Sequence, residues 1–174
     1  MKQFFRKHIR LVTVIVLLFI IYMGYLTSKQ SVNIDDELDK VISDYILDKF
    51  EDGYKEFEAH KIYGIEEKDN IINVYMYSLC RGYSLSNKTF YMRGEYSHPV
   101  FMTLKKNNNE YSVVECKEAE YGINYEESVM NIFPKAYIKK ALYDTEYSAG
   151  LRENIRKQAK KWLKEEGLKG FFVQ

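Results

Sequence analysis

The residues best suited to chemistry are three histidines and two cysteines: His8, His60, His98, Cys80 and Cys116. Zinc sites need such residues clustered at short spacings, and a cysteine nucleophile needs a base at hand. None of the five stands in an H-E-x-x-H or C-x-x-C spacing, and the chain has no G-x-S-x-G, G-x-x-x-x-G-K-[ST] or G-x-G-x-x-G motif. The sequence therefore predicts a protein without catalytic activity, cofactor or metal site.

The two cysteines, Cys80 and Cys116, fall in predicted strands and raise the question of a disulfide. In a simple meander one strand separates theirs, which places the Cα atoms about 9–10 Å apart. A disulfide tolerates Cα separations up to about 7 Å. Two buried free thiols are the favoured interpretation, and the bridge stays open at this point.

A binding pocket is the other chemical possibility, because a sheet that curves over a helix can leave a cavity lined by tyrosines and a few polar groups. Its candidate residues are Tyr63, Tyr75, Tyr77, Glu58 and His60. Aromatic cross-strand pairs that only stabilise the sheet are the alternative explanation, since the chain has 16 tyrosines.

The last predicted helix, Ser148 to Glu165, carries an apolar stripe and a basic remainder. The stripe consists of Leu151, Ile155, Ala159, Trp162 and Leu163. The basic residues are Arg152, Arg156, Lys157, Lys160, Lys161 and Lys164. This basic face is a candidate contact for anionic lipid headgroups or wall polymer, although such charge runs are more often simply solvated.

The elements that must position these residues can be predicted from hydrophobic periodicity. A period near 3.6 over Ile34 to Phe50 predicts an amphipathic helix capped by Asn33 or Asp35. From Tyr54 the period changes to two, and Lys68-Asp69-Asn70 is typical of a hairpin turn. Further strands are expected over residues 90–106, broken near His98-Pro99, and over 111–117.

Three further helices are expected after the strands, over residues 125–133, 136–142 and 148–165, with Pro134 and Gly167 as stop signals. The predicted fold class is α+β: an N-terminal transmembrane helix, then one helix packed on a curved four-stranded antiparallel sheet with C-terminal helices. This order of elements resembles the cystatin-like and nuclear-transport-factor-2-like (NTF2-like) cone folds, which suggests a shape and leaves function open.

An uncharged run of sixteen residues, Leu11 to Leu26, follows four basic residues near the N-terminus. Extended to Ser28, it is long enough to cross a bilayer, and the basic flank places the rest of the chain outside the cytoplasm. We predict a basic cytoplasmic leader (1–10), a transmembrane signal-anchor (11–28) and one extracytoplasmic domain (29–174). Cleavage as a signal peptide is the alternative, disfavoured because bulky aromatics such as Tyr22 and Tyr25 stand where a cleavage site needs small residues.

The formal net charge of +1 hides a division along the chain. Residues 1–30 carry 5 basic and 0 acidic side chains, residues 31–133 carry 11 and 20, and residues 134–174 carry 10 and 5. Binding to nucleic acid takes most of its affinity from clustered Lys and Arg. An acidic middle segment therefore argues against a nucleic-acid partner.

Four segments carry a resemblance to a known family: AHKIYGIEEKDN (59–70), VYMYSL (74–79), PVFMTLKKNNNEYSVVE (99–115) and IFPKAY (132–137). Over roughly residues 35–165 the chain resembles an extracytoplasmic domain of Gram-positive bacteria that accompanies membrane metallopeptidases of the β-lactam-sensor antirepressor type. The resemblance transfers no catalytic motif, and the peptidase's zinc helix is absent from this sequence.

Two functions of different classes follow as expectations. The leading one is a single-pass, membrane-anchored sensing or protein-interaction module whose partner is an unidentified protein. The alternative is an NTF2-like scaffold subunit of an envelope or conjugative secretion complex. A small enzyme that uses a tyrosine-lined cone ranks third.

Overall fold

The computed structural model describes residues 34–50, 54–87, 89–108, 110–143, 147–168 and 171–173, together with Val16. The chain divides into two units, Met1–Val32 and Asn33–Gln174, and every element described below belongs to the second. The predicted leader and signal-anchor over residues 1–28 lie outside the described residues, apart from Val16. Within the described part of the chain, no helix is both long enough and apolar enough to cross a bilayer.

The first helix of this unit, α2 (Asp36–Lys49), matches the helix expected from Ile34 to Phe50. The Asp35 side chain caps it by accepting a 2.8 Å hydrogen bond from the Leu38 backbone N–H. A capping side chain satisfies one of the backbone donors that a helix start leaves unpaired. Leu38 and Ile42 are fully buried against the sheet, so the amphipathic pattern orients the helix as predicted.

Four long strands form an antiparallel meander in the order β1-β2-β3-β4, which confirms the predicted α+β class and four-stranded sheet. Their bounds are β1 Lys55–Lys68, β2 Ile71–Ser86, β3 Thr89–Asn107 and β4 Glu110–Glu118. Asp69 and Asn70 make the first turn with φ angles of 52° and 64°, which suits a two-residue hairpin. A short fifth strand, β5 (Phe171–Val173), runs parallel to β3 and was not predicted.

The break expected at His98-Pro99 is wrong, because β3 continues through both residues. The Pro99 carbonyl accepts a hydrogen bond from the Ala119 N–H, just beyond the end of β4. In an antiparallel ladder the nitrogen and the carbonyl of one residue face the same neighbour. The N–H that proline lacks would therefore point past β4, and no hydrogen bond between β2 and β3 is lost.

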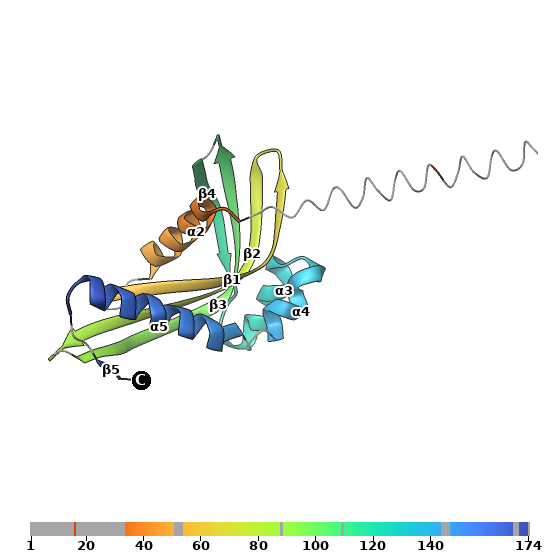
Figure 1. The fold of residues 1–174 in the computed structure, drawn as a ribbon. Helices are drawn as coiled ribbons and strands as arrows, with labels where there is room; N and C mark the ends of the chain where they lie inside the picture. Colours follow the sequence, from red (N-terminus) through yellow and green to blue (C-terminus); the bar gives the residue numbers. More distant parts are fainter. Residues whose placement is uncertain are drawn as a thin grey trace, which may run out of the picture. The chain divides into compact units, whose positions relative to one another are not determined.

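The two faces of the sheet are covered by different helices. Figure 1 shows the long strands bending along their length, with α2 on the inner side of the bend. The inner face carries Val74 and Met76, both fully buried with residues of α2. Register shifts at three points along the strands are β-bulges, which increase the local twist of a sheet.

The outer face is covered by the C-terminal helices α3 (Tyr125–Ile132), α4 (Lys135–Tyr143) and α5 (Tyr147–Glu165), after a short 3-10 helix, η1 (Gly122–Asn124). These bounds agree with the three expected helices. Tyr63 and Tyr75 pack with Val129 and Phe133 beneath α3 and α4. Tyr75, a predicted pocket residue, is only 5% exposed, so the helices seal its side of β2 from solvent.

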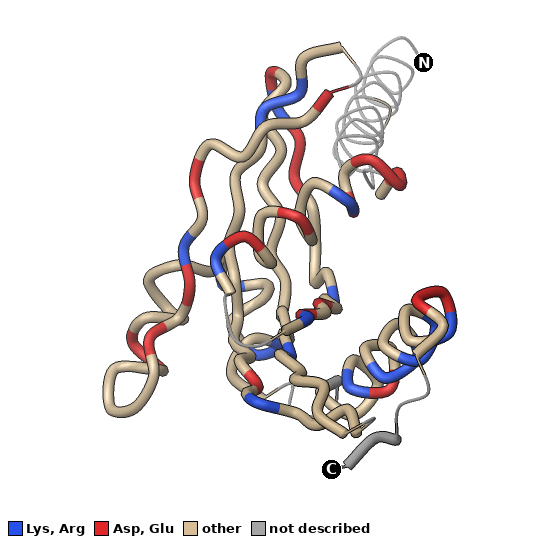
Figure 2. The backbone as a smooth tube through the Cα atoms, turned by 90° about the vertical axis from the view of Figure 1, so that its left-hand side faces the viewer, with Lys and Arg blue, Asp and Glu red and all other residues tan. Residues whose placement is uncertain are grey.

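The last helix, α5, lies on the outer face of the other half of the sheet. Its predicted stripe packs there: Leu151, Ile155, Ala159 and Leu163 are buried, with Trp162 beside them. The helix ends at Glu165. Gly167, with a φ of +64°, completes a Schellman cap through hydrogen bonds from the Gly167 and Leu168 N–H groups to the last turn. Figure 2 shows Lys and Arg recurring along this helix.

Candidate functional site

The inner face carries a polar region that runs beside α2 and continues past the C-terminal turn of this helix. Strand register places two cross-strand rows there, His60–Ser78–His98 and Glu58–Cys80–Tyr96, with Glu118 of β4 opposite Val100 in the next row. Side chains alternate between the faces of a strand, so all these residues share the α2 side of the sheet. Glu58, Ser78 and His98 are buried polar residues.

One half of this polar region is a closed network that ties α2 to β1. Glu58 accepts hydrogen bonds from Ser43 of α2 at 2.8 Å and from Ser78 at 3.2 Å. The His60 ring lies between two carboxylates, with Nδ1 3.2 Å from Glu58 and Nε2 3.2 Å from Asp39 of α2. A buried carboxylate is stable only when it is paired and hydrogen-bonded, and this one is both.

The charge of His60 follows from these contacts. Burial alone would lower its pKa, but the hydrogen bonds and charges of Asp39 and Glu58 outweigh burial and raise the pKa to about 9. The imidazole is therefore protonated at neutral pH, and each ring nitrogen donates to a carboxylate. Neither nitrogen is left as a base or as a metal ligand.

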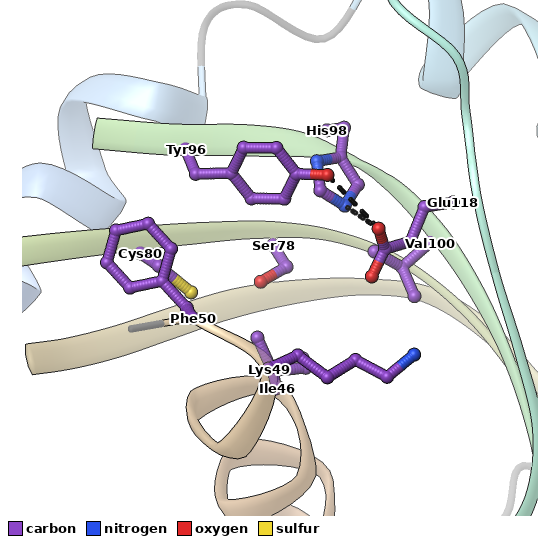
Figure 3. A pocket seen from close by; sticks show the side chains of 9 residues that line it. All are labelled: Ile46, Lys49, Phe50, Ser78, Cys80, Tyr96, His98, Val100 and Glu118. Atoms are coloured by element: carbon purple, nitrogen blue, oxygen red, sulfur yellow. Dashed lines mark hydrogen bonds and ion pairs between the residues drawn. The ribbon is translucent and has the colours of Figure 1, made fainter. Parts of the chain in front are cut away.

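The other half of the polar region borders a cavity of about 420 Å³ between the end of α2 and strands β2, β3 and β4 (Figure 3). Its lining is mixed, with apolar, aromatic, hydroxyl, thiol and charged side chains. The lining residues are Ile46, Lys49, Phe50, Ser78, Cys80, Tyr96, His98, Val100 and Glu118. A concave site with a few convergent polar groups is the usual form of a small-molecule pocket.

Glu118 is the central charged group of the cavity. Its Oε2 atom accepts a 3.1 Å hydrogen bond from the Tyr96 hydroxyl and lies 3.5 Å from His98 Nε2. The hydrogen bond from His98 is the main cause that lowers the pKa of the Glu118 carboxyl, against the opposing effect of burial. The carboxylate is therefore ionised at neutral pH. His98 is fixed from its other side, where Nδ1 lies 3.3 Å from the Tyr121 hydroxyl.

The last turn of α2 supplies the cavity's other wall. The Phe50 ring stacks against Tyr96, with ring centroids 6.2 Å apart. The Lys49 ammonium lies 4.8 Å from the centroid of the Tyr45 ring, and a hydrogen bond to that tyrosine raises the pKa of Lys49. Lys49 is therefore a fixed positive charge at the rim.

The candidate nucleophiles of this region are inactive. Burial is the largest cause that raises the pKa of Cys80 to about 12 and that of Cys116 to about 11, so both stay thiols at neutral pH. Ser78 donates its hydrogen bond to Glu58, and among the described residues no histidine accepts a hydrogen bond from its hydroxyl. The surroundings of the two thiols and of the Ser78 hydroxyl therefore do not activate them as nucleophiles.

The cysteines are free, as the sequence favoured. Cys80 lies opposite Tyr96 and Cys116 lies opposite Met102, so their positions differ by six residues along β3. Six strand residues span about 20 Å. This offset along the strands, added to the strand between them, puts a Cys80–Cys116 bridge out of reach.

The structure separates the five predicted pocket residues. Glu58 and His60 lie on the inner face, in the closed network beside the cavity. Tyr63 and Tyr75 lie beneath α3 and α4 on the outer face, and Tyr77 is partly buried beside them. None of the five lines the cavity. Sequence reasoning missed Tyr96, His98 and Glu118, because the expected break at Pro99 concealed the register that brings them together.

The predicted basic face of α5 is partly neutralised within the chain. Arg152 pairs with Glu95 of β3 at 2.6 Å, and Arg156 pairs with Glu153 at 2.8 Å. Lys161 lies 3.8 Å from Glu165. The remaining predicted residues, Lys157, Lys160 and Lys164, are exposed. Arg152 therefore fastens α5 to the sheet and is not available to an anionic surface.

Comparison of the chain with protein-family models, with curated protein sequences and with solved structures finds no match in any of the three. Among the described residues, no group of three or more His, Cys, Asp or Glu side chains is arranged to hold a metal ion. Function must therefore be inferred from the geometry of the inner face.

Proposed function

We propose that the protein is a membrane-anchored, extracytoplasmic recognition module without catalytic activity. The observation that carries the proposal is the inner-face cavity. It is large enough for a small molecule, and its charged groups are held by neighbouring side chains, while the thiols and the serine beside it are not activated. A site with fixed charges and no nucleophile is suited to binding.

The location rests on the sequence. Four basic residues precede an uncharged run from Leu11 to Leu26, and the following domain has an acidic middle segment. This asymmetry is typical of a single span with the C-terminal domain outside. A sheet bent around one helix is also the general form of cystatin-like and NTF2-like cones, and such folds serve many binding roles.

The proposed partner is a protein of the same membrane. The resemblance to domains that accompany β-lactam-sensor antirepressor peptidases supports a sensing role, in which occupancy of the cavity changes how the domain contacts its partner. Ligand binding can shift a partner equilibrium only through different affinities for the free and the bound state. The cavity borders the C-terminal turn of α2, so a ligand would contact that helix directly.

The second candidate, an NTF2-like scaffold subunit of an envelope complex, is favoured by apolar side chains on the outer helices. Ile123 of η1 is 99% exposed, and Met130 of α3 is 50% exposed. A contiguous exposed apolar patch marks an interaction site, and this alternative places both residues in such a patch. In this alternative the outer helices bind other subunits and the cavity has no regulatory role.

The experiment has two parts. Protease added to intact protoplasts should digest the domain of the full chain, whereas a cytoplasmic control protein should survive. Crosslinking in membranes followed by detergent solubilisation should then capture a membrane protein. Substitution of Ile123 and Met130 by Ser separates the candidates, since it abolishes capture by a scaffold and leaves capture by a sensing module intact. Protection of the domain from protease would contradict the extracytoplasmic location.

A further inference from the structure

The cavity on the inner face contains one acceptor that the protein does not use. Glu118 Oε2 accepts a hydrogen bond from the Tyr96 hydroxyl and lies next to His98 Nε2, as Figure 3 shows. In the part of the chain that the structure describes, no donor lies within hydrogen-bonding distance of Glu118 Oε1. The Glu118 side chain is 35% exposed, and it lines the cavity. Glu58, by comparison, has both oxygens occupied.

We propose that the cavity binds a small organic molecule through a primary ammonium group, which donates to Glu118 Oε1 while its apolar body packs between Phe50 and Val100. A carboxylate held in place by neighbouring donors needs no rearrangement to accept a cation. The faces of Phe50 and Tyr96 add attraction for a positive charge, because aromatic faces carry a negative quadrupole. Ile46 supplies further apolar wall.

The surroundings also set limits on the ligand. An anion at the Glu118 end of the cavity would be repelled by this carboxylate, because like charges in a partly buried site repel strongly. The Lys49 ammonium lies at the rim of the cavity, over the Tyr45 ring. No ion pair between Lys49 and Glu118 is found among the described residues. The ammonium group can therefore belong to a simple amine or to an amino acid, whose carboxylate would then lie near Lys49.

This inference gives the proposed recognition module its ligand class, and it rests on that function only for its biological meaning. The test uses the full chain in a non-ionic detergent and measures binding by ligand-observed NMR titration. The probes are benzylamine, benzyl alcohol and benzoate, which share a ring and differ in charge. Benzylamine should bind at least about tenfold more tightly than either of the others, the difference typical of a charge-assisted hydrogen bond.

Two variants test the role of the carboxylate. Glu118→Gln keeps the shape of the side chain and an acceptor for the Tyr96 hydroxyl. It should weaken the binding of benzylamine by about tenfold or more. The matched control is Glu115→Gln, since Glu115 lies on the same strand but opposite Thr103, on the outer face. The control should leave benzylamine binding within about twofold. Phe50→Leu should also weaken the binding of benzylamine. This second variant keeps the test valid if Glu118→Gln proves poorly folded.

The source of the ammonium group is tested with phenylalanine and its amide. If the ligand is an amino acid, phenylalanine should bind more tightly than the amide, and Lys49→Ala should remove that preference. If it is a simple amine, the two should bind equally in both proteins.

Equal affinity for benzylamine and benzyl alcohol, or unchanged benzylamine binding by a folded Glu118→Gln, would overturn the inference. Failure of benzylamine to bind a folded wild-type chain would also overturn it. None of these three results would bear on membrane location or partner capture, because those are measured separately.

Discussion

The inner and outer faces of the sheet are built from alternate residues of the same strands, yet they have different roles. The outer face is covered by three helices and carries stacked aromatic rings. The centroid of the Tyr75 ring lies 5.0 Å from that of Tyr137 and 5.2 Å from that of Phe101. The inner face is covered by one helix, which shares a buried ion network with β1 and borders a cavity at its C-terminal end. The outer face therefore provides mainly packing, and the inner face retains groups that can bind.

The largest effect should come from placing a charge on either face where helices cover it. Val74→Asp on the inner face and Tyr75→Asp on the outer face should both unfold the domain. An unpaired buried carboxylate costs several kcal/mol, against a total stability of roughly 5–15 kcal/mol. Circular dichroism and thermal melting of the two variants measure this. A native-like melting temperature for Tyr75→Asp would mean that α3 and α4 do not seal the outer face in solution.

The burial of Tyr75 shows where sequence reasoning reaches its limit. The period of two along β2 and the turn at Asp69-Asn70 could be read directly, because strand alternation and turn chemistry are local. Which helices cover a second, tyrosine-rich face is not a local property. A tyrosine can be buried when its hydroxyl finds a partner, as Tyr75 does at 3.2 Å from Glu66, so its polarity did not reveal its location.

The candidate site was harder to predict than the fold for the same reason. Glu58 and His60 are two residues apart on one strand, and their shared face could be predicted. His98 and Glu118 are twenty residues apart, and they meet only because β3 continues through Pro99 and pairs with β4 in the register that sets Val100 opposite Glu118. Register between distant strands depends on the whole sheet, which a reading of local periods does not capture.

A close approach on the outer face should give the next largest effect. A Cβ atom added at Gly64 would overlap the Tyr137 ring of α4. Gly64→Ala should therefore destabilise the domain by about 1–3 kcal/mol, the usual cost of overpacking. Urea denaturation measures the loss. Gly150→Ala is the control, since nothing lies near a Cβ at that exposed helical position, and helix propensity should make the change neutral or slightly stabilising.

The buried network on the inner face should make stability depend on pH. The pKa of His60 is about 9 in the folded protein and about 6.5 when unfolded, so folding favours the protonated form. The resulting stabilisation is complete below about pH 6.5, and it is lost as the pH rises through about 9. It amounts to about 3 kcal/mol at most for a side chain that is 6% exposed.

Urea denaturation from pH 6 to pH 9.5 tests this dependence. Wild-type stability should fall over the interval, and His60→Gln should be less stable at pH 6 with a flatter profile. A wild-type profile that stays flat would show that Asp39 and Glu58 do not hold the imidazolium.

The smallest effect should come from the cavity, and it separates binding groups from packing groups within the inner face. Glu58→Gln should cost several kcal/mol, because it leaves protonated His60 beside a neutral amide in a position that is 1% exposed. Glu118→Gln should change stability by less than about 1 kcal/mol, since its partly solvated contact with His98 is long at 3.5 Å and Tyr96 keeps an acceptor. Thermal and urea unfolding of the two variants provide the comparison. If Glu118→Gln proves as destabilising as Glu58→Gln, Glu118 is part of the framework, and the division of the inner face into a packed network and an accessible cavity is wrong.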